Sequence, residues 1–129
     1  MYDGSVYKGQ FVRNNIEGQG EYTWTNGRYY TGDWVANRMH GHGTFKWPDG
    51  RAYKGQYVND LKHGEGEMKW ADGRKYVGSW YDGKQHGEGI YRKDGRDRRG
   101  IWEDGKRIKW LDDVKWNDLK DAGNDNRDN

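Results

Sequence analysis

Along most of the chain, apolar and polar positions alternate with a period of two, which is typical of β-strands that turn one face toward a core. Tyr30, Gly32 and Trp34 fall on one face of such a run, and the residues between them fall on the other. A second run follows at residues 41–47, where glycines and aromatic residues again share one face. Asn, Asp and Gly residues separate the runs, and they accept the left-handed backbone of tight turns. The pattern therefore predicts a series of β-hairpins.

The hairpin pattern recurs along the chain as a unit of 23 residues, one residue shorter in the fourth copy. The clearest copy, residues 30–52, reads YTGDWVANRMHGHGTFKWPDGRA. Repeats of this kind form arrays in which each unit packs on its neighbours. We divide the chain into the end of a preceding partial repeat (1–6), a repeat array at 7–109 (7–29, 30–52, 53–75, 76–97 and a partial unit at 98–109), and a C-terminal cap with an acidic tail at 110–129.

Glycines recur in mid-strand on the aromatic face of each unit. Glycine in a strand often marks a place where another group approaches the backbone closely. Rings from neighbouring strands can lie flat across this bare backbone and stack on one another, so a single sheet can cover its own apolar face. The predicted fold class is all-β, a single-layer antiparallel meander. We expect its opposite face, rich in Lys, Gln and Glu, to be solvated.

The repeat pattern decays toward the C-terminus, where bulky Ile108, Trp110 and Leu111 stand near the positions of the glycines. Such a change is expected of a cap that ends the stacking. Asp112 or Asp113 could begin a short helix that runs to about Ala122, although the apolar spacing there is poor for one helix face. We therefore predict an irregular or short helical cap.

Composition limits the function classes. The chain has 129 residues, a mean hydropathy of −1.47 and 16% aromatic residues, which suits a thin aromatic structure better than a disordered chain. It has no cysteine, and no run of about 20 apolar residues that could span a membrane. A net charge of +2 is too balanced for a dedicated nucleic-acid binder. We expect a soluble, intracellular protein that does not bind nucleic acid.

The motifs Y-x-G-x-W, H-G-x-G and D-G-R recur in phase along the chain. In residues 30–52 they are carried by Tyr30, Gly32, Trp34, His40, Gly41, Gly43, Asp49 and Gly50. The chain in this respect resembles the MORN (membrane occupation and recognition nexus) repeat family. The resemblance implies a twisted single-layer sheet that serves as a scaffold for other proteins, often in cytoskeletal, ciliary or membrane-associated structures. It also raises phosphoinositide binding as an alternative.

Catalytic and metal chemistry find little support in the sequence. His40, His63 and His86 recur one repeat apart, so they should lie about 9.5 Å from one another, too far to share a metal ion. The G-x-G steps lie inside strands, whereas a phosphate loop needs a glycine turn before a helix. We expect no enzymatic activity, no metal and no cofactor, and we expect the histidines to brace hairpin ends.

Two surfaces remain as candidates for partner binding. The first is an aromatic groove for a peptide or helix of another protein, with the alternative that these rings only hold the sheet together. Its residues are Tyr30, Trp34, Trp47, Tyr53, Tyr57, Trp70, Tyr76 and Trp80.

The second candidate surface is a basic segment that could contact anionic phospholipid, with solvated or intramolecularly paired charge as the alternative. Its residues are Arg92, Lys93, Arg96, Arg98, Arg99, Lys106, Arg107 and Lys109. A third possibility is a structural subunit of a larger complex, held through the open edges of the sheet.

Overall fold

A computed structural model describes residues 4–111 of the chain. These residues form one sheet of ten antiparallel strands, and each strand pairs with the strand before it and the strand after it. The strands are β1 (Val6–Val12), β2 (Asn15–Thr23), β3 (Tyr29–Val35), β4 (Arg38–Lys46), β5 (Ala52–Val58), β6 (Leu61–Lys69), β7 (Lys75–Tyr81), β8 (Lys84–Lys93), β9 (Arg96–Glu103) and β10 (Lys106–Trp110). The predicted all-β meander is confirmed.

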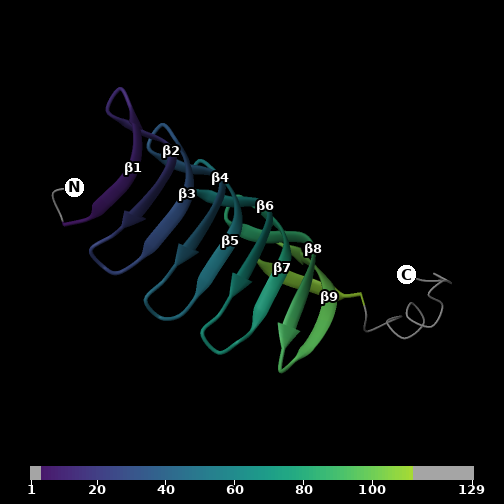
Figure 1. The fold of residues 1–129 in the computed structure, drawn as a ribbon. Helices are drawn as coiled ribbons and strands as arrows, with labels where there is room; N and C mark the ends of the chain where they lie inside the picture. The colour runs from purple at the N-terminus through teal and green to yellow at the C-terminus, as the bar shows by residue number, and fades with distance from the viewer. Residues whose placement is uncertain (1–3, 112–129) are drawn as a thin grey trace.

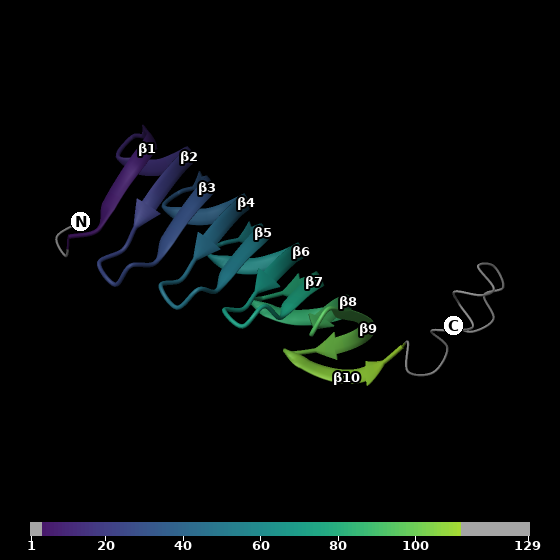
Figure 2. The ribbon, with the colours of Figure 1, turned by 60° about the horizontal axis from the view of Figure 1, so that its bottom comes forward.

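The sheet is a single layer that advances by one hairpin per repeat. Figure 1 shows an elongated, twisted ribbon with β1 at one end and β9 near the other. Figure 2, turned from that view, shows the strands following one another in chain order as far as β10. No helix occurs in residues 4–111, and the predicted helix at 112–122 lies outside the described part of the chain.

Two kinds of turn connect the strands. Within each unit, a turn of two residues with positive φ joins the strands, as at Ala36 (φ 49°) and Asn37 (φ 68°). Between the first four units the connection is a longer loop, as where the Trp47 N–H donates to the Arg51 carbonyl at 3.0 Å. Asp94 and Gly95 form a two-residue turn between the fourth and fifth units. The Asn and Asp residues in the sequence thus mark real turns, because they tolerate the left-handed backbone.

A bulge interrupts the hairpin of each of the four full units between its glycine and its second aromatic residue. In β3 and β4, Gly32 faces Gly43 and Trp34 faces Met39. The single residue Asp33 therefore lies opposite residues 40–42 of β4. The Asp33 carboxylate accepts the His42 backbone N–H at 2.9 Å on that stretch. A bulge bends the strand and increases its twist. These bulges therefore bend and twist the sheet at the same position in each full repeat.

The core is the aromatic face of the sheet. Tyr30, Tyr53 and Tyr76 are fully buried, and each lies over the glycine of the next strand. The Tyr53 hydroxyl donates to the Gln56 carbonyl at 2.9 Å, and the other two make the equivalent bond. The buried tyrosine rings therefore pack on the bare backbone of glycines, as predicted.

Candidate functional site

The aromatic residues predicted to bind a partner form a continuous column along the sheet. Tyr53 lies edge-on to Tyr57 of its own unit at 5.2 Å between ring centroids, and to Trp80 of the next unit at 5.3 Å. The Trp80 indole donates to the Gly66 carbonyl at 3.1 Å. We call seven buried rings that lie edge-on to one another the aromatic column: Tyr30, Trp34, Tyr53, Tyr57, Tyr76, Trp80 and Trp102.

Burial separates the eight predicted residues into two groups. Six of them belong to the aromatic column and have almost no surface left for a partner, whereas Trp47 and Trp70 are half-buried in the loops between units. Burial also raises the pKa of the column tyrosines, that of Tyr76 to about 12. The larger share of the predicted contact surface therefore works as the core of the fold.

The half-buried tryptophans carry arginines on their rings. The Arg51 guanidinium lies 4.8 Å from the Trp47 ring centroid, and Arg74 takes the same position on Trp70 at 5.3 Å. Asp72 orients Arg74 through an ion pair of 2.8 Å, and the backbone N–H of Arg74 lowers the pKa of that carboxyl. The D-G-R motif thus holds an arginine on each loop tryptophan, a contact that the sequence analysis did not foresee.

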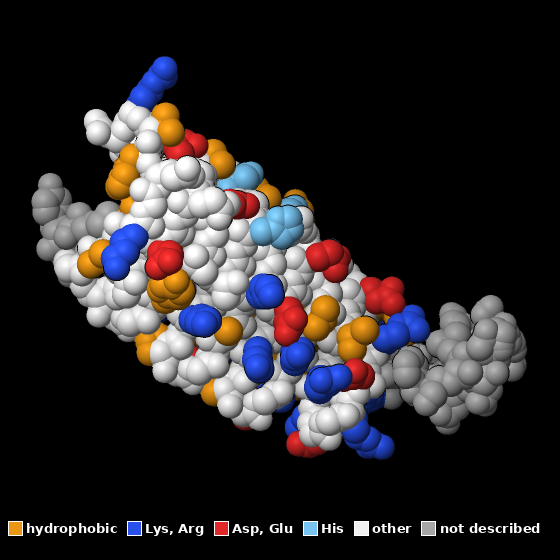
Figure 3. All heavy atoms as spheres, in the orientation of Figure 1, with side chains coloured by type: hydrophobic (Ala, Val, Ile, Leu, Met, Phe, Trp, Pro, Cys, Tyr) orange, Lys and Arg blue, Asp and Glu red, His pale blue; other side chains and the backbone are white. Residues whose placement is uncertain are grey.

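A groove of about 760 Å³ lies on the opposite face of the sheet. We call it the polar groove; it crosses β2 to β7 and is open to solvent. Its floor is the bare backbone of Gly32, Gly43, Gly55 and Gly66, and its walls are Gln19, Thr31, His42, Thr44, Lys54, Gln56, Glu65, Glu67 and Val77. None of the eight predicted aromatic residues lines it. In Figure 3 much of this face is backbone and uncharged polar surface.

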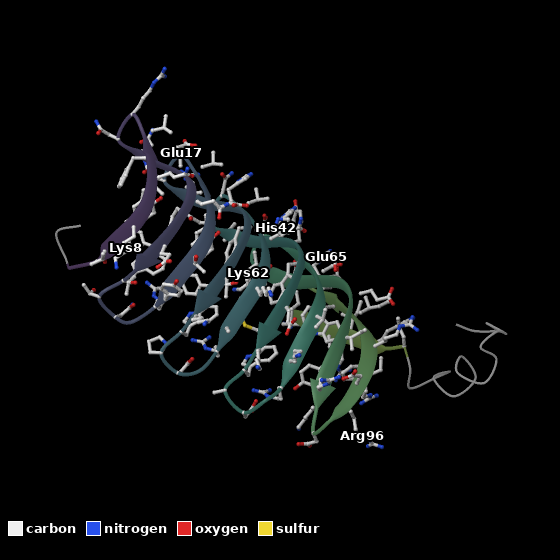
Figure 4. The ribbon with its side chains drawn as sticks, in the orientation of Figure 1. Lys8, Glu17, His42, Lys62, Glu65 and Arg96 are labelled. Atoms are coloured by element: carbon white, nitrogen blue, oxygen red, sulfur yellow. The ribbon has the colours of Figure 1, made fainter. Side chains whose placement is uncertain are left out.

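Two of the carboxylates in the walls of the polar groove have partners within the sheet. The Ser79 hydroxyl donates to Glu65 at 3.0 Å, and Lys75 pairs with Glu67 at 3.2 Å. Figure 4 shows that His42 of β4 and Glu65 of β6 lie along the same side of the ribbon. The sequence pattern contained a signal for this groove, because side chains that face away from the column flank a row of glycines.

The basic segment does not form one surface. Strand alternation places Arg92, Arg99, Lys106 and Lys109 on the groove face and Lys93, Arg96, Arg98 and Arg107 on the aromatic face. Arg92 pairs with Asp97 at 2.6 Å and Arg99 pairs with Glu88 at 3.0 Å.

The aromatic-face half of the segment surrounds a hollow of about 410 Å³, which Tyr91, Asp94 and Trp110 also line. We call it the basic hollow. The guanidinium carbons of Arg98 and Arg107 lie 3.9 and 4.4 Å from the centroid of the Trp110 ring. The structure thus gathers four of the eight predicted residues at one place.

Lys62 occupies an unexpected position on the aromatic face. Its ammonium lies 5.5 to 5.6 Å from the ring centroids of Trp47, Tyr53 and Trp80. Burial lowers the pKa of this lysine, and the surrounding rings favour its cationic form. Equivalent positions in the first two units hold Ile16 and Met39, so Lys62 takes the place of an apolar core residue.

His40 and His86 brace hairpin ends, as the sequence indicated for the three repeated histidines. His40 Nδ1 accepts the Asn59 backbone N–H and His86 Nδ1 accepts the Asp104 N–H, both at 3.3 Å. Glu17, which replaces His in the first unit, accepts the Ala36 N–H at 2.8 Å. Within residues 4–111, no three His, Cys, Asp or Glu side chains are grouped so that they could hold a metal. That part of the chain also contains no helix long and apolar enough to cross a membrane.

Comparison with known families gives a direct match. The model of the MORN repeat matches residues 7–27, 30–50, 53–73 and 76–96, one match for each full unit. The matched segments begin at Tyr7, Tyr30, Tyr53 and Tyr76; the first three end in the loops between units and the fourth ends at Arg96, where β9 begins. No curated protein matches the chain.

Proposed function

Because the chain belongs to the MORN repeat family, we propose that it is a scaffold that holds a segment of a partner protein, a peptide or a helix, and does not catalyse a reaction. MORN repeats are in general interaction motifs for proteins or membranes. A cytoskeletal, ciliary or membrane-associated assembly inside the cell is the setting that we propose for it.

The observation that carries this proposal is the polar groove. It runs along the repeats, crosses six strands and is open to solvent, so an elongated segment can contact several repeats at once. Its floor is strand backbone, so a partner can lie between the side chains that flank it. Its walls offer hydroxyl, amide, carboxylate and ammonium groups, which fix the orientation of a bound segment.

The aromatic face has a smaller direct role in the proposal. Trp47 and Trp70 keep exposed ring surface beside their arginines, and a partner that wraps over the loops between units would contact them. The six buried residues of the predicted set act through the fold, because they hold the sheet that shapes the groove.

Capture of the native partner tests the proposal. Thr44 lies in the groove wall and Thr23 lies on the same face outside the groove. We expect Thr44→Arg to remove the partner that the wild-type chain captures from native lysate, because the longer side chain fills the groove, and Thr23→Arg to retain it. Circular dichroism shows that both variants are folded. Capture of the same proteins by wild type, Thr44→Arg and a Trp47→Ala/Trp70→Ala variant would contradict the proposal.

The basic hollow favours a second candidate function, that of an adaptor at an anionic membrane surface. Each basic residue near a charged membrane contributes about 1 kcal/mol, and four of them line the hollow against a single acidic residue, Asp94. We expect flotation with phosphoinositide-containing liposomes to be lost in Arg96→Glu/Arg98→Glu/Arg107→Glu. Arg92→Glu/Arg99→Glu, on the opposite face, is the control. Equal flotation of both variants, or none by the wild type, would exclude this candidate.

A further inference from the structure

A row of exposed apolar side chains follows the hairpin ends of the sheet. Val12, Val35, Val58 and Tyr81 hold the same position in four successive units and are 53%, 48%, 37% and 55% exposed. We call them the rim row. Single exposed apolar residues are common on protein surfaces, but an aligned row of them marks an interaction surface.

The rim row lies on the same face as the polar groove. Each member follows a residue of the aromatic face in sequence, a buried ring in every unit except the first, where Phe11 is exposed. The alternation of the strand therefore turns the row away from the aromatic column. Tyr81 lies between His63 and His86, at 5.3 and 6.0 Å between ring centroids. Val58 faces the exposed Leu61 across its hairpin. Figure 3 shows hydrophobic side chains and histidines interspersed along this rim.

The spacing of the rim row matches the repeat of an α-helix. Successive members lie two strands apart, about 9.6 Å at a strand spacing of about 4.8 Å. Helix residues seven positions apart lie on one side of the helix and are separated by about 10.5 Å. A helix lying along the rim therefore presents one apolar residue to each repeat, and it needs about 19 residues to reach from Val12 to Tyr81.

The charges beside the rim row give such a helix an orientation. Between the row and the glycine floor, strands β1 to β8 carry the carboxylates of Glu17, Asp33, Glu65 and Glu88 and no Lys or Arg residue. At the far end of the face, Arg99 of β9 pairs with Glu88 at 3.0 Å, and Lys109 of β10 lies at the same level. Figure 4 shows Glu17 and Glu65 along this side of the ribbon. Beyond the row, Arg38 faces Val35 and Lys84 faces Tyr81. The turn residues themselves include Asp60 and Asp82, and the Asp60 carboxylate accepts the Met39 N–H at 2.8 Å.

We infer that the rim row docks an amphipathic α-helix of the partner, with apolar residues seven positions apart, a basic flank toward the groove and an acidic flank toward the turns. This inference rests on the proposed scaffold function and names the kind of segment that the scaffold holds. The helix lies along the repeat axis, its apolar side on Val35, Val58 and Tyr81 and its basic side chains against Asp33 and Glu65.

The test uses a designed helix as the probe. It is a labelled peptide of about 22 residues with Leu at every seventh position, Lys on one flank and Glu on the other, and its control is a scrambled peptide of the same composition. Fluorescence anisotropy measures the affinity of the full chain for each peptide. We expect the helix to bind, the scrambled peptide to bind at least about tenfold more weakly, and added salt to weaken binding.

Matched variants locate the contact. Val35→Asp/Val58→Asp removes two members of the rim row, whereas Val6→Asp/Ile90→Asp changes two similarly exposed residues, 49% and 41%, away from it. We expect the rim variant to lose at least about tenfold in affinity and the control variant to keep it. Unchanged affinity in the rim variant, or equal binding of the helical and scrambled peptides, would overturn the inference.

Capture of the native partner separates this inference from the proposed function. If Thr44→Arg loses the native partner and Val35→Asp/Val58→Asp retains it, the scaffold function stands and the helix docking site is wrong. If neither variant loses a partner, both are wrong.

Discussion

A methyl group on the glycine beneath a buried tyrosine should destabilise the sheet strongly. A Cβ atom at Gly66 would lie 2.1 Å from the Tyr53 hydroxyl oxygen and 2.5 and 2.6 Å from two of its ring carbons. Non-bonded atoms pack at about 3.5–4.0 Å, so in Gly66→Ala the ring of Tyr53 must rise from the backbone by about 1 Å or more. Gly66 has no positive φ, so alanine fits its backbone and the cost comes from the ring alone.

The expected cost of Gly66→Ala follows from what the displaced ring loses. Overpacking a tight core costs about 1–3 kcal/mol, and the bond from the Tyr53 hydroxyl to Gln56, 2.9 Å long, contributes about 1 kcal/mol. Alanine recovers about 0.4–1 kcal/mol by restricting the unfolded chain. We therefore expect a loss of about 1–3.5 kcal/mol in the free energy of unfolding. Urea unfolding followed by tryptophan fluorescence measures it.

Two comparisons decide whether the ring is the cause. In a Tyr53→Ala background, Gly66→Ala should cost almost nothing, because the methyl group no longer meets a ring. Gly73 has a φ of 96° and no atom within 4 Å of its would-be Cβ, so Gly73→Ala should cost about 1–2 kcal/mol in both backgrounds. A Gly66→Ala cost that is within about 0.5 kcal/mol of zero, or equal in both backgrounds, would refute the reasoning.

Three further predictions concern the column and its end. Burial raises the pKa of Tyr76 from 10.0 to about 12, so the folded chain keeps protons that the unfolded chain loses. The free energy of unfolding should keep this contribution below about pH 10 and lose it as the pH rises toward 12, and tyrosinate absorbance should appear at higher pH in the folded chain than in the unfolded chain. Tyrosinate absorbance at the same pH in both would contradict this. Trp110→Ala removes the ring that contacts Trp102 and Tyr91 and should lower the free energy of unfolding by about 2 kcal/mol. Hydrogen exchange should rise first in β9 and β10. A uniform rise in exchange along the sheet would argue against a local cap. His86→Ala leaves the Asp104 N–H without its acceptor and should lower the free energy of unfolding by about 0.5–1.5 kcal/mol, whereas unchanged urea unfolding would contradict the bracing role.

The repeat, the hairpins and the packing of rings on glycine follow from local sequence. Period-two alternation assigns Tyr53 and Tyr57 to one face, and the glycines mark the positions where a ring can lie against the backbone. The degree of burial does not follow in the same way. Tyr53 is 1% exposed because Trp80 of the next unit covers it, and a pattern within one unit does not show how far its neighbour reaches across.

The binding surfaces were less predictable than the fold for a related reason. The row of glycines that lines the polar groove is visible in the sequence. The bulge at Asp33 is not, because it depends on the register between β3 and β4. The basic segment is a different case. Alternation already separates Arg98 from Arg99, so the sequence contained the division of the segment between two faces.

Side-chain footprinting with hydroxyl radicals, on the free chain and on the chain bound to the helical probe, tests most directly whether one face forms the core and the other binds. We predict that Tyr81, Val35 and Val58 are modified in the free chain and protected in the complex, while Tyr30, Tyr53 and Tyr76 remain unmodified in both. Strong modification of the three buried tyrosines in the folded chain, or protection that appears on the aromatic face when the probe binds, would contradict the account.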